Sequence, residues 1–124
     1  MEKEIIKSDK GFFVGDICYA LSEKNKSIWA EHNYEDGVFA VPGTSLKFAV
    51  KNVGGDYYFE DTKNRVYETD AGNIGVVPLE LLEGKYRDNG HIFKGAGEAI
   101  ILTENKFLII TLPNGEEVRI NYSL

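Results

Sequence analysis

The sequence has 124 residues, a formal net charge of −6 and a single cysteine, Cys18. This length fits one domain, residues 1–124, that can bury a core of its own. The basic residues are scattered among acids and form no stripe for phosphates, which argues against direct nucleic-acid binding. One cysteine and two histidines outside any metal-ligand spacing argue against an internal disulfide and a metal site, so we expect no cofactor.

Neither a leader nor a membrane segment is evident in the sequence. The first ten residues lack an apolar run of signal-peptide length, and no stretch approaches the roughly 18 apolar residues of a membrane span. We therefore expect a cytoplasmic protein with no membrane partner.

Short apolar runs between glycine-rich turns predict many short strands. In chain order, strands are expected at residues 4–7, 12–14, 38–41, 46–51, 56–60, 66–68, 74–77, 98–103, 106–112 and 117–122. The last three form an antiparallel meander with turns at Glu104-Asn105 and at residues 113–115. Because residues 107–110 are apolar on both faces, that strand should be central and covered on both sides.

One helix is predicted at residues 22–34, capped by Ser22 or Asn25 and closed by Asp36-Gly37. Its few apolar side chains, mainly Ile28 and Trp29, should press onto a sheet. Residues 78–83 predict a single helical turn that starts with proline. The expected fold is all-β (β-rich), either an antiparallel β-sandwich or a partly open β-barrel, with one peripheral α-helix.

Two segments carry the strongest local signals. Asp16 follows a strand and a glycine, so it either caps a helical turn starting at Ile17 or presents its carboxylate to a ligand. Cys18 is expected to be a small buried apolar residue. In residues 70–81, Gly72 and Gly75 either form an ordinary turn or aim backbone N–H groups at an anion.

Three motifs also support a family resemblance: GDxCYxL at residues 15–21, GDYY at 55–58 and DxGxIGxVPxEL at 70–81. Over residues 11–82 the chain resembles a family of small uncharacterised proteins from bacteria and their phages, whose members often have proline at the position of Ile17. The family has no established activity, so the resemblance implies a phage or prophage accessory role and assigns no task to any residue.

Aromatic and arginine side chains are the remaining candidates for a binding face. Tyrosine and tryptophan offer area and a polar tip, and arginine can hold a carboxylate or phosphate bidentately, although ring packing and surface charge explain the same residues. The candidate ligand-binding set is Asp16, Trp29, Tyr57, Tyr58, Asp70, Gly72, Arg87, His91 and Arg119. No catalytic residue is assigned.

These observations favour a non-enzymatic binding protein, a phage accessory of the anti-defence type. It would sequester a small nucleotide-like molecule or block a host protein. One alternative is an acidic protein–protein inhibitor or nucleic-acid mimic, and another is a small hydrolase or isomerase that uses Asp16, Asp70 or His91. The paired carboxylates at 60–61 and 116–117 should be solvated. Open strand edges predict a homo-oligomer.

Overall fold

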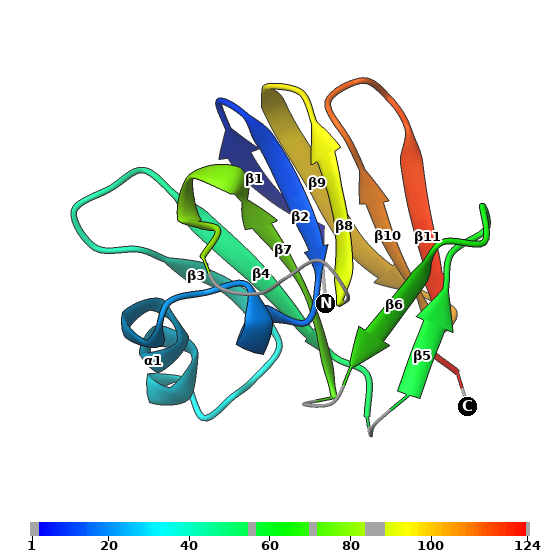
Figure 1. Ribbon diagram of the computed structural model, residues 1–124, viewed down its shortest axis with the longest axis horizontal. Coiled ribbons are helices and arrows are strands. Elements are labelled where there is room, and N and C mark those ends of the chain that lie inside the picture. Colours follow the sequence, from blue (N-terminus) through cyan, green and yellow to red (C-terminus); the bar gives the residue numbers. More distant parts are fainter. Residues whose placement is uncertain (1–2, 55–56, 70–71, 84–88, 124) are drawn as a thin grey trace.

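The computed structural model describes residues 3–54, 57–69, 72–83 and 89–123 (Figure 1). Sheet A has four strands, in the order β1 (Glu4–Ser8), β9 (Gly97–Glu104), β10 (Phe107–Thr111) and β11 (Glu117–Asn121). Sheet B has five, in the order β3 (Gly37–Ala40), β4 (Lys47–Asn52), β7 (Asn73–Pro78), β2 (Gly11–Gly15) and β8 (Gly90–Lys94). A separate hairpin pairs β5 (Tyr57–Glu60) with β6 (Val66–Thr69), and every pairing is antiparallel.

Sheets A and B pack face to face around the main core. Sheet A contributes alternate side chains such as Ile101, Leu108 and Ile110, and sheet B contributes Phe12 and Val14; all are essentially inaccessible to solvent. Residues two apart on a strand share a face, so this alternation places one apolar side of each sheet inward. The expected β-rich sandwich is therefore confirmed, and it is not a closed barrel.

A second core lies on the outer face of sheet B. Phe13, Phe48 and Val77 project from the sheet and meet Ile17 and Trp29, which come from the covering helical segments. Those segments are the 3-10 turn η1 (Ile17–Tyr19), the helix α1 (Glu23–Glu31) and the 3-10 turn η2 (Leu79–Leu81). Sheet B is thus the middle of three layers, and every residue of β2 and β7 is buried.

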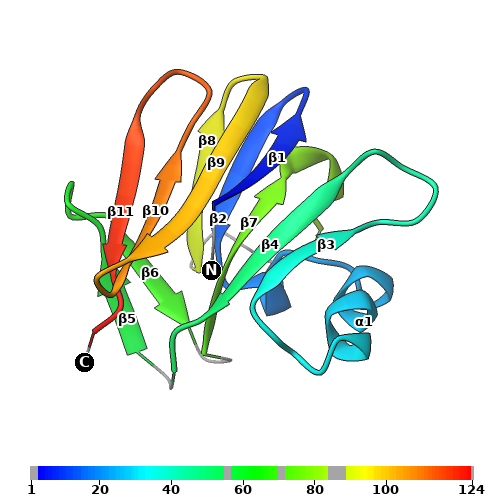
Figure 2. The same cartoon turned by 180° about the vertical axis from the view of Figure 1, so that it is seen from behind.

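The strand covered on both sides is not the one the sequence indicated. β10 is central in sheet A, but Figure 2 shows no further layer on its outer face. Ile109 is nevertheless buried there, where it stands in register with Leu102 of β9 and Arg119 of β11. Strand β8 was missed, since its five residues include only two large aliphatic or aromatic side chains, Ile92 and Phe93.

Local boundaries also shifted. The predicted helix to residue 34 ends at Glu31, because Asn33 and Tyr34 both adopt left-handed backbone angles, with φ of 57°. Ser22 is its cap, and its side chain accepts from the Asn25 N–H. The predicted Glu104-Asn105 turn instead lies at Asn105 and Lys106, whose positive φ angles suit a two-residue hairpin.

The hairpin β5–β6 closes one side of the sandwich. β6 contacts β8 of sheet B, β5 contacts β11 of sheet A, and Asp61 forms a bridge to Ile120. On the other side, β1 is the terminal strand of sheet A and lies near β4 of sheet B. Within the described segments, no helix is long and apolar enough to span a membrane.

Candidate functional site

The two motif segments meet at a buried polar cluster. Asn73 at the start of β7 accepts a hydrogen bond from the Ile17 N–H at 3.0 Å and donates one to Asp16 Oδ1 at 3.2 Å. Asp16 is 0% exposed and accepts from the Cys18 N–H at 2.9 Å, so it caps η1 as the sequence suggested. The carboxylate is therefore engaged in holding the turn against the sheet.

Burial and the adjacent charge of Asp16 raise the pKa of the Cys18 thiol, against smaller opposing effects of Asn73 and Lys26. A raised pKa keeps the sulfur protonated at neutral pH, and the thiolate is the nucleophilic form. Cys18 is only partly buried, which differs slightly from the expected fully buried residue. Nothing in this environment activates it.

The glycines of the second motif serve two separate purposes. Gly72 has a φ of 72°, which glycine tolerates, and its carbonyl accepts from the Val53 and Gly54 N–H groups. Gly75 lies inside β7, directly under the Ile17 side chain, where a Cβ would collide with that side chain. Gly75 therefore permits close packing between β7 and η1, whereas Gly72 joins the beginning of β7 to residues 53–54. Asp70 lies outside the described residues.

The remaining predicted site residues do not converge. Trp29 is 6% exposed, and its indole N–H donates to the Glu35 carbonyl at 2.9 Å. His91 packs edge-on against Tyr67, with Nε2 placed 2.8 Å from the Val66 carbonyl. Arg119 lies on the outer face of sheet A over the Phe107 ring and pairs with Glu117.

Tyr58 is 70% exposed on the hairpin and is a surface residue. The side chain of Tyr57 and all of Arg87 lie outside the described residues. Among the predicted positions whose side chains or backbone the structure describes, Asp16 and Gly72 belong to segments that the fold joins, through Asn73.

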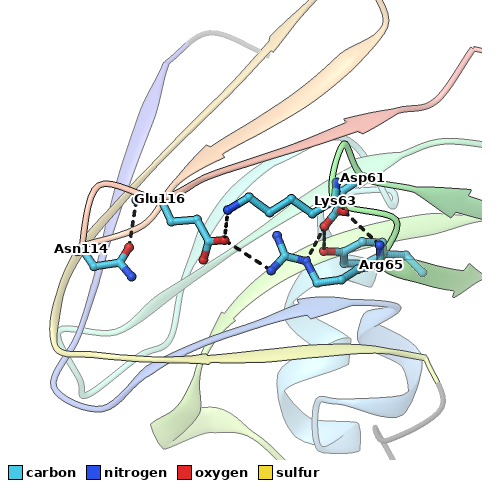
Figure 3. Close-up of polar contacts among 6 residues, drawn as sticks. Asp61, Lys63, Arg65, Asn114 and Glu116 are labelled. Atoms are coloured by element: carbon cyan, nitrogen blue, oxygen red, sulfur yellow. Dashed lines mark hydrogen bonds and ion pairs between the residues drawn. The ribbon is translucent and has the colours of Figure 1, made fainter.

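A buried carboxylate with several hydrogen-bond partners, Asp61, was expected to be solvated. Asp61 is 5% exposed and accepts from the Lys63 and Arg65 N–H groups, from Arg65 Nε at 2.6 Å and from the Tyr67 hydroxyl at 2.7 Å (Figure 3). Glu116, in the β10–β11 turn, pairs with Lys63 at 2.6 Å and with Arg65 at 3.4 Å.

This network fixes the hairpin to both sheets. Burial alone would raise the pKa of Asp61, but hydrogen bonds from Arg65 and Tyr67 outweigh it and hold the pKa below its ordinary value. The Arg65 guanidinium also lies 4.8 Å from the Phe93 ring centroid, and its Nη2 has no hydrogen-bond partner among the described residues. Arg65 is committed to internal contacts, so we assign the network a structural role.

A different group of residues forms a cleft at one end of the sandwich, beside the ends of β4 and β11. The cleft has a volume of about 440 Å³ and is lined by Lys51, Asn52, Val53, Lys106, Tyr122 and Ser123. Lys51 comes from β4, Lys106 from the β9–β10 turn, and Tyr122 follows β11.

Two ammonium groups converge on one aromatic ring in this cleft. The Nζ atoms of Lys51 and Lys106 lie 5.1 and 5.9 Å from the centroid of the Tyr122 ring. Lys51 also pairs with Asp36 at 2.7 Å, whereas no ion pair joins Lys106 to any residue that the structure describes. Asp36 in turn accepts from Asn52, which orients the amide at the cleft wall.

Burial alone would raise the pKa of Asp36, but hydrogen bonds from Lys51 and Asn52 lower it below its ordinary value. Asp36 therefore stays charged at neutral pH and offsets one of the two lysines. The cleft side chains with their anchor carry two positive charges and one negative, on a protein whose formal charge is −6.

Sequence reasoning missed this cleft entirely. Lys51 and Lys106 each stand beside a turn, and Tyr122 is the last residue of the predicted strand at 117–122. The three residues share no sequence motif, and the packing of sheet A against sheet B brings them together. The one available signal was the presence of lysines at two strand ends within an acidic chain.

Comparisons with known proteins gave no match among protein-family models, curated proteins or solved structures. Groups of three or more histidine, cysteine, aspartate or glutamate side chains that could hold a metal ion are also absent from the described parts of the chain. The assignment of a function therefore depends on the cleft itself.

Proposed function

We propose that the chain is a binding protein that holds a small anionic, nucleotide-like ligand in the cleft of Lys51, Lys106 and Tyr122. The observation that carries the proposal is the convergence of two lysine ammonium groups on one tyrosine ring. Small-molecule sites are typically concave, of about 300–1,000 Å³, and combine aromatic surface with a few polar groups.

Lys106 is available to an anion because its contact with the Tyr122 ring is weak. A cation–π contact at a partly exposed site contributes roughly 0.5–1 kcal/mol, whereas a hydrogen bond to a charged group contributes roughly 1.5–3 kcal/mol. A phosphate or carboxylate can therefore draw Lys106 from the ring, and Lys51 can serve it while keeping Asp36. The Asn52 amide and the Ser123 hydroxyl supply further polar contacts at the wall.

A nucleotide-like ligand suits the combination of charge and aromatic surface. Its phosphate matches the ammonium groups, and a planar base can stack on the tyrosine ring once the lysines have turned toward the phosphate. Sequestration of such a molecule would agree with the phage-accessory role that the family resemblance implies. The hydrolase or isomerase alternative has less support, because Asp16 holds η1 and His91 packs against Tyr67.

Isothermal titration calorimetry against inorganic phosphate, nucleoside mono- and diphosphates and cyclic dinucleotides tests the proposal. Loss of one charged contact of roughly 1.5–3 kcal/mol predicts about ten- to a hundredfold weaker binding for Lys106→Ala. Lys24→Ala, an exposed lysine of α1, is the matched control and should bind as the native chain does. Absence of binding across the panel, or equal affinity of the two variants, would refute the proposal.

A further inference from the structure

The open side of the sandwich presents an unpaired strand edge. β1 pairs with β9 on one side, and among the described strands none pairs with it on the other. In such an edge strand, alternate residues direct their backbone N–H and C=O groups away from the sheet. These groups form a template to which an extended peptide can add as a further strand.

A groove runs along this edge, between β1 and the beginning of β4. It has a volume of about 230 Å³ and is lined by Ile5, Ile6, Lys7, Ser45 and Lys47. Ile5 is 46% exposed and offers an apolar contact beside the free backbone groups. The groove therefore combines the two elements of strand addition, backbone hydrogen bonding and side-chain contacts.

Both charged residues that line the groove are lysines, although the chain as a whole is acidic. Lys7 faces Glu98 at 3.8 Å across an exposed pair, which is worth little in water. Lys47 forms no ion pair with the residues that the structure describes, and Glu4 is the one acidic residue of β1. Lys7 and Lys47 come from different sheets, so a partner strand with carboxylates meets one lysine from each sheet in the groove.

The same charges disfavour a second copy of this chain as the occupant. Antiparallel pairing of β1 with the β1 of another copy would bring a second Lys7 into a groove that already holds Lys7 and Lys47. Like charges placed together in this way oppose association, and edge lysines are a common protection against self-pairing. Charge complementarity therefore selects an acidic extended segment of another protein.

We propose that the β1 edge and the Lys7–Lys47 groove bind an acidic, extended peptide segment of a partner protein by strand addition. This site is distinct from the cleft of Lys51, Lys106 and Tyr122 and does not depend on the proposed ligand. It also provides a surface for the expected blocking of a host protein.

Fluorescence polarisation with three labelled eight-residue peptides tests this inference. The acidic strand-forming peptide TEVETEVE should bind the native protein. Its basic counterpart TKVKTKVK should bind at least tenfold more weakly, because its lysines carry the same positive charge as those of the groove. The acidic peptide TEPETEPE should also bind at least tenfold more weakly, because proline removes backbone donors and disfavours an added strand.

Variants locate the site and separate it from the cleft. Lys47→Glu should weaken binding of TEVETEVE at least tenfold, whereas Lys24→Glu, with the same change of charge on α1, should leave it unchanged. Lys106→Ala should also leave it unchanged, so that failure of the ligand proposal and failure of this one are distinguishable. Circular dichroism confirms that each variant is folded.

Three results would overturn the inference: equal binding of TEVETEVE and TEPETEPE, equal binding of the acidic and basic peptides, or full affinity in Lys47→Glu. Sedimentation velocity adds a fourth outcome. The oligomeric state of the native protein and of Lys47→Glu should be the same. A dimer of the native protein that Lys47→Glu abolishes would assign this edge to a second copy instead.

Discussion

Replacement of Asp61 by alanine should destabilise the fold strongly, because it removes a buried carboxylate that several donors share. Asp61 is the common acceptor for two backbone N–H groups, for Arg65 Nε and for the Tyr67 hydroxyl. Alanine removes the acceptor and leaves these donors in place, in a position where the side chain of residue 61 is almost fully buried.

The magnitude follows from the donors left behind. Tyr67 is 0% exposed, and an unsatisfied buried hydroxyl costs about 1–3 kcal/mol. Breaking a fully buried ion pair costs about 3–5 kcal/mol. The loss of the Asp61–Arg65 pair should cost less than this, because Arg65 is partly exposed and keeps its ion pair with Glu116. We expect a total loss of about 3 kcal/mol, a large part of the roughly 5–15 kcal/mol that stabilises a typical domain.

Urea unfolding followed by the fluorescence of Trp29 measures this loss directly. The matched control is a double-mutant cycle with Tyr67→Phe, which removes the stranded hydroxyl. Tyr67→Phe should cost less in the Asp61→Ala background than in the native chain. A loss below about 1 kcal/mol for Asp61→Ala, or additive effects of the two substitutions, would contradict the proposed role of the network.

Three further predictions concern titration, thiol reactivity and packing. Because the folded pKa of Asp61 lies below its ordinary value of 3.8, its contribution is full above that value and is lost as the pH falls through the lower folded pKa. The difference in unfolding free energy between the native chain and Asp61→Ala should therefore narrow as the pH falls below 3.8, and a constant difference down to acid unfolding would oppose this. Cys18, with its raised pKa, should react with a disulfide reagent at neutral pH more slowly than a free peptide thiol, and an accelerated reaction would show an activated sulfur. Gly75→Ala should cost about 1–3 kcal/mol through collision with Ile17, measured by urea unfolding, and an unchanged stability would contradict the close packing of η1 on β7.

Most of the secondary structure could be predicted from the sequence, because local periodicity determines it. Alternating side chains located ten of the eleven described strands, and Ser22 marked the beginning of α1. The early end of α1 was not predicted, because it depends on the left-handed backbone of Asn33 and Tyr34. The Asn52 side chain donates a hydrogen bond to the Tyr34 carbonyl at 2.8 Å. A contact between residues 18 positions apart leaves no trace in local pattern.

Side-chain surroundings were harder to predict, because they depend on how the two sheets meet. Asp61 lies in a turn rich in polar residues, and such a position predicts a solvated carboxylate. The bridge to Ile120 instead places it against β11, where it is buried. The lysines of the cleft have ordinary surface sequence contexts, and only the register of β4, β10 and β11 places them around Tyr122. The cap at Asp16 was predictable because a cap is a local interaction.

The most direct test of the account is a two-dimensional ¹⁵N–¹H NMR titration of the native protein with a nucleoside diphosphate. We predict amide shifts concentrated at residues 51–53, 106 and 122–123, which in Lys106→Ala should require about ten- to a hundredfold more ligand. Shifts that centre on Asp16, Asn73 and Cys18 instead, or an unchanged spectrum at millimolar ligand, would contradict the assignment of this cleft as the binding site.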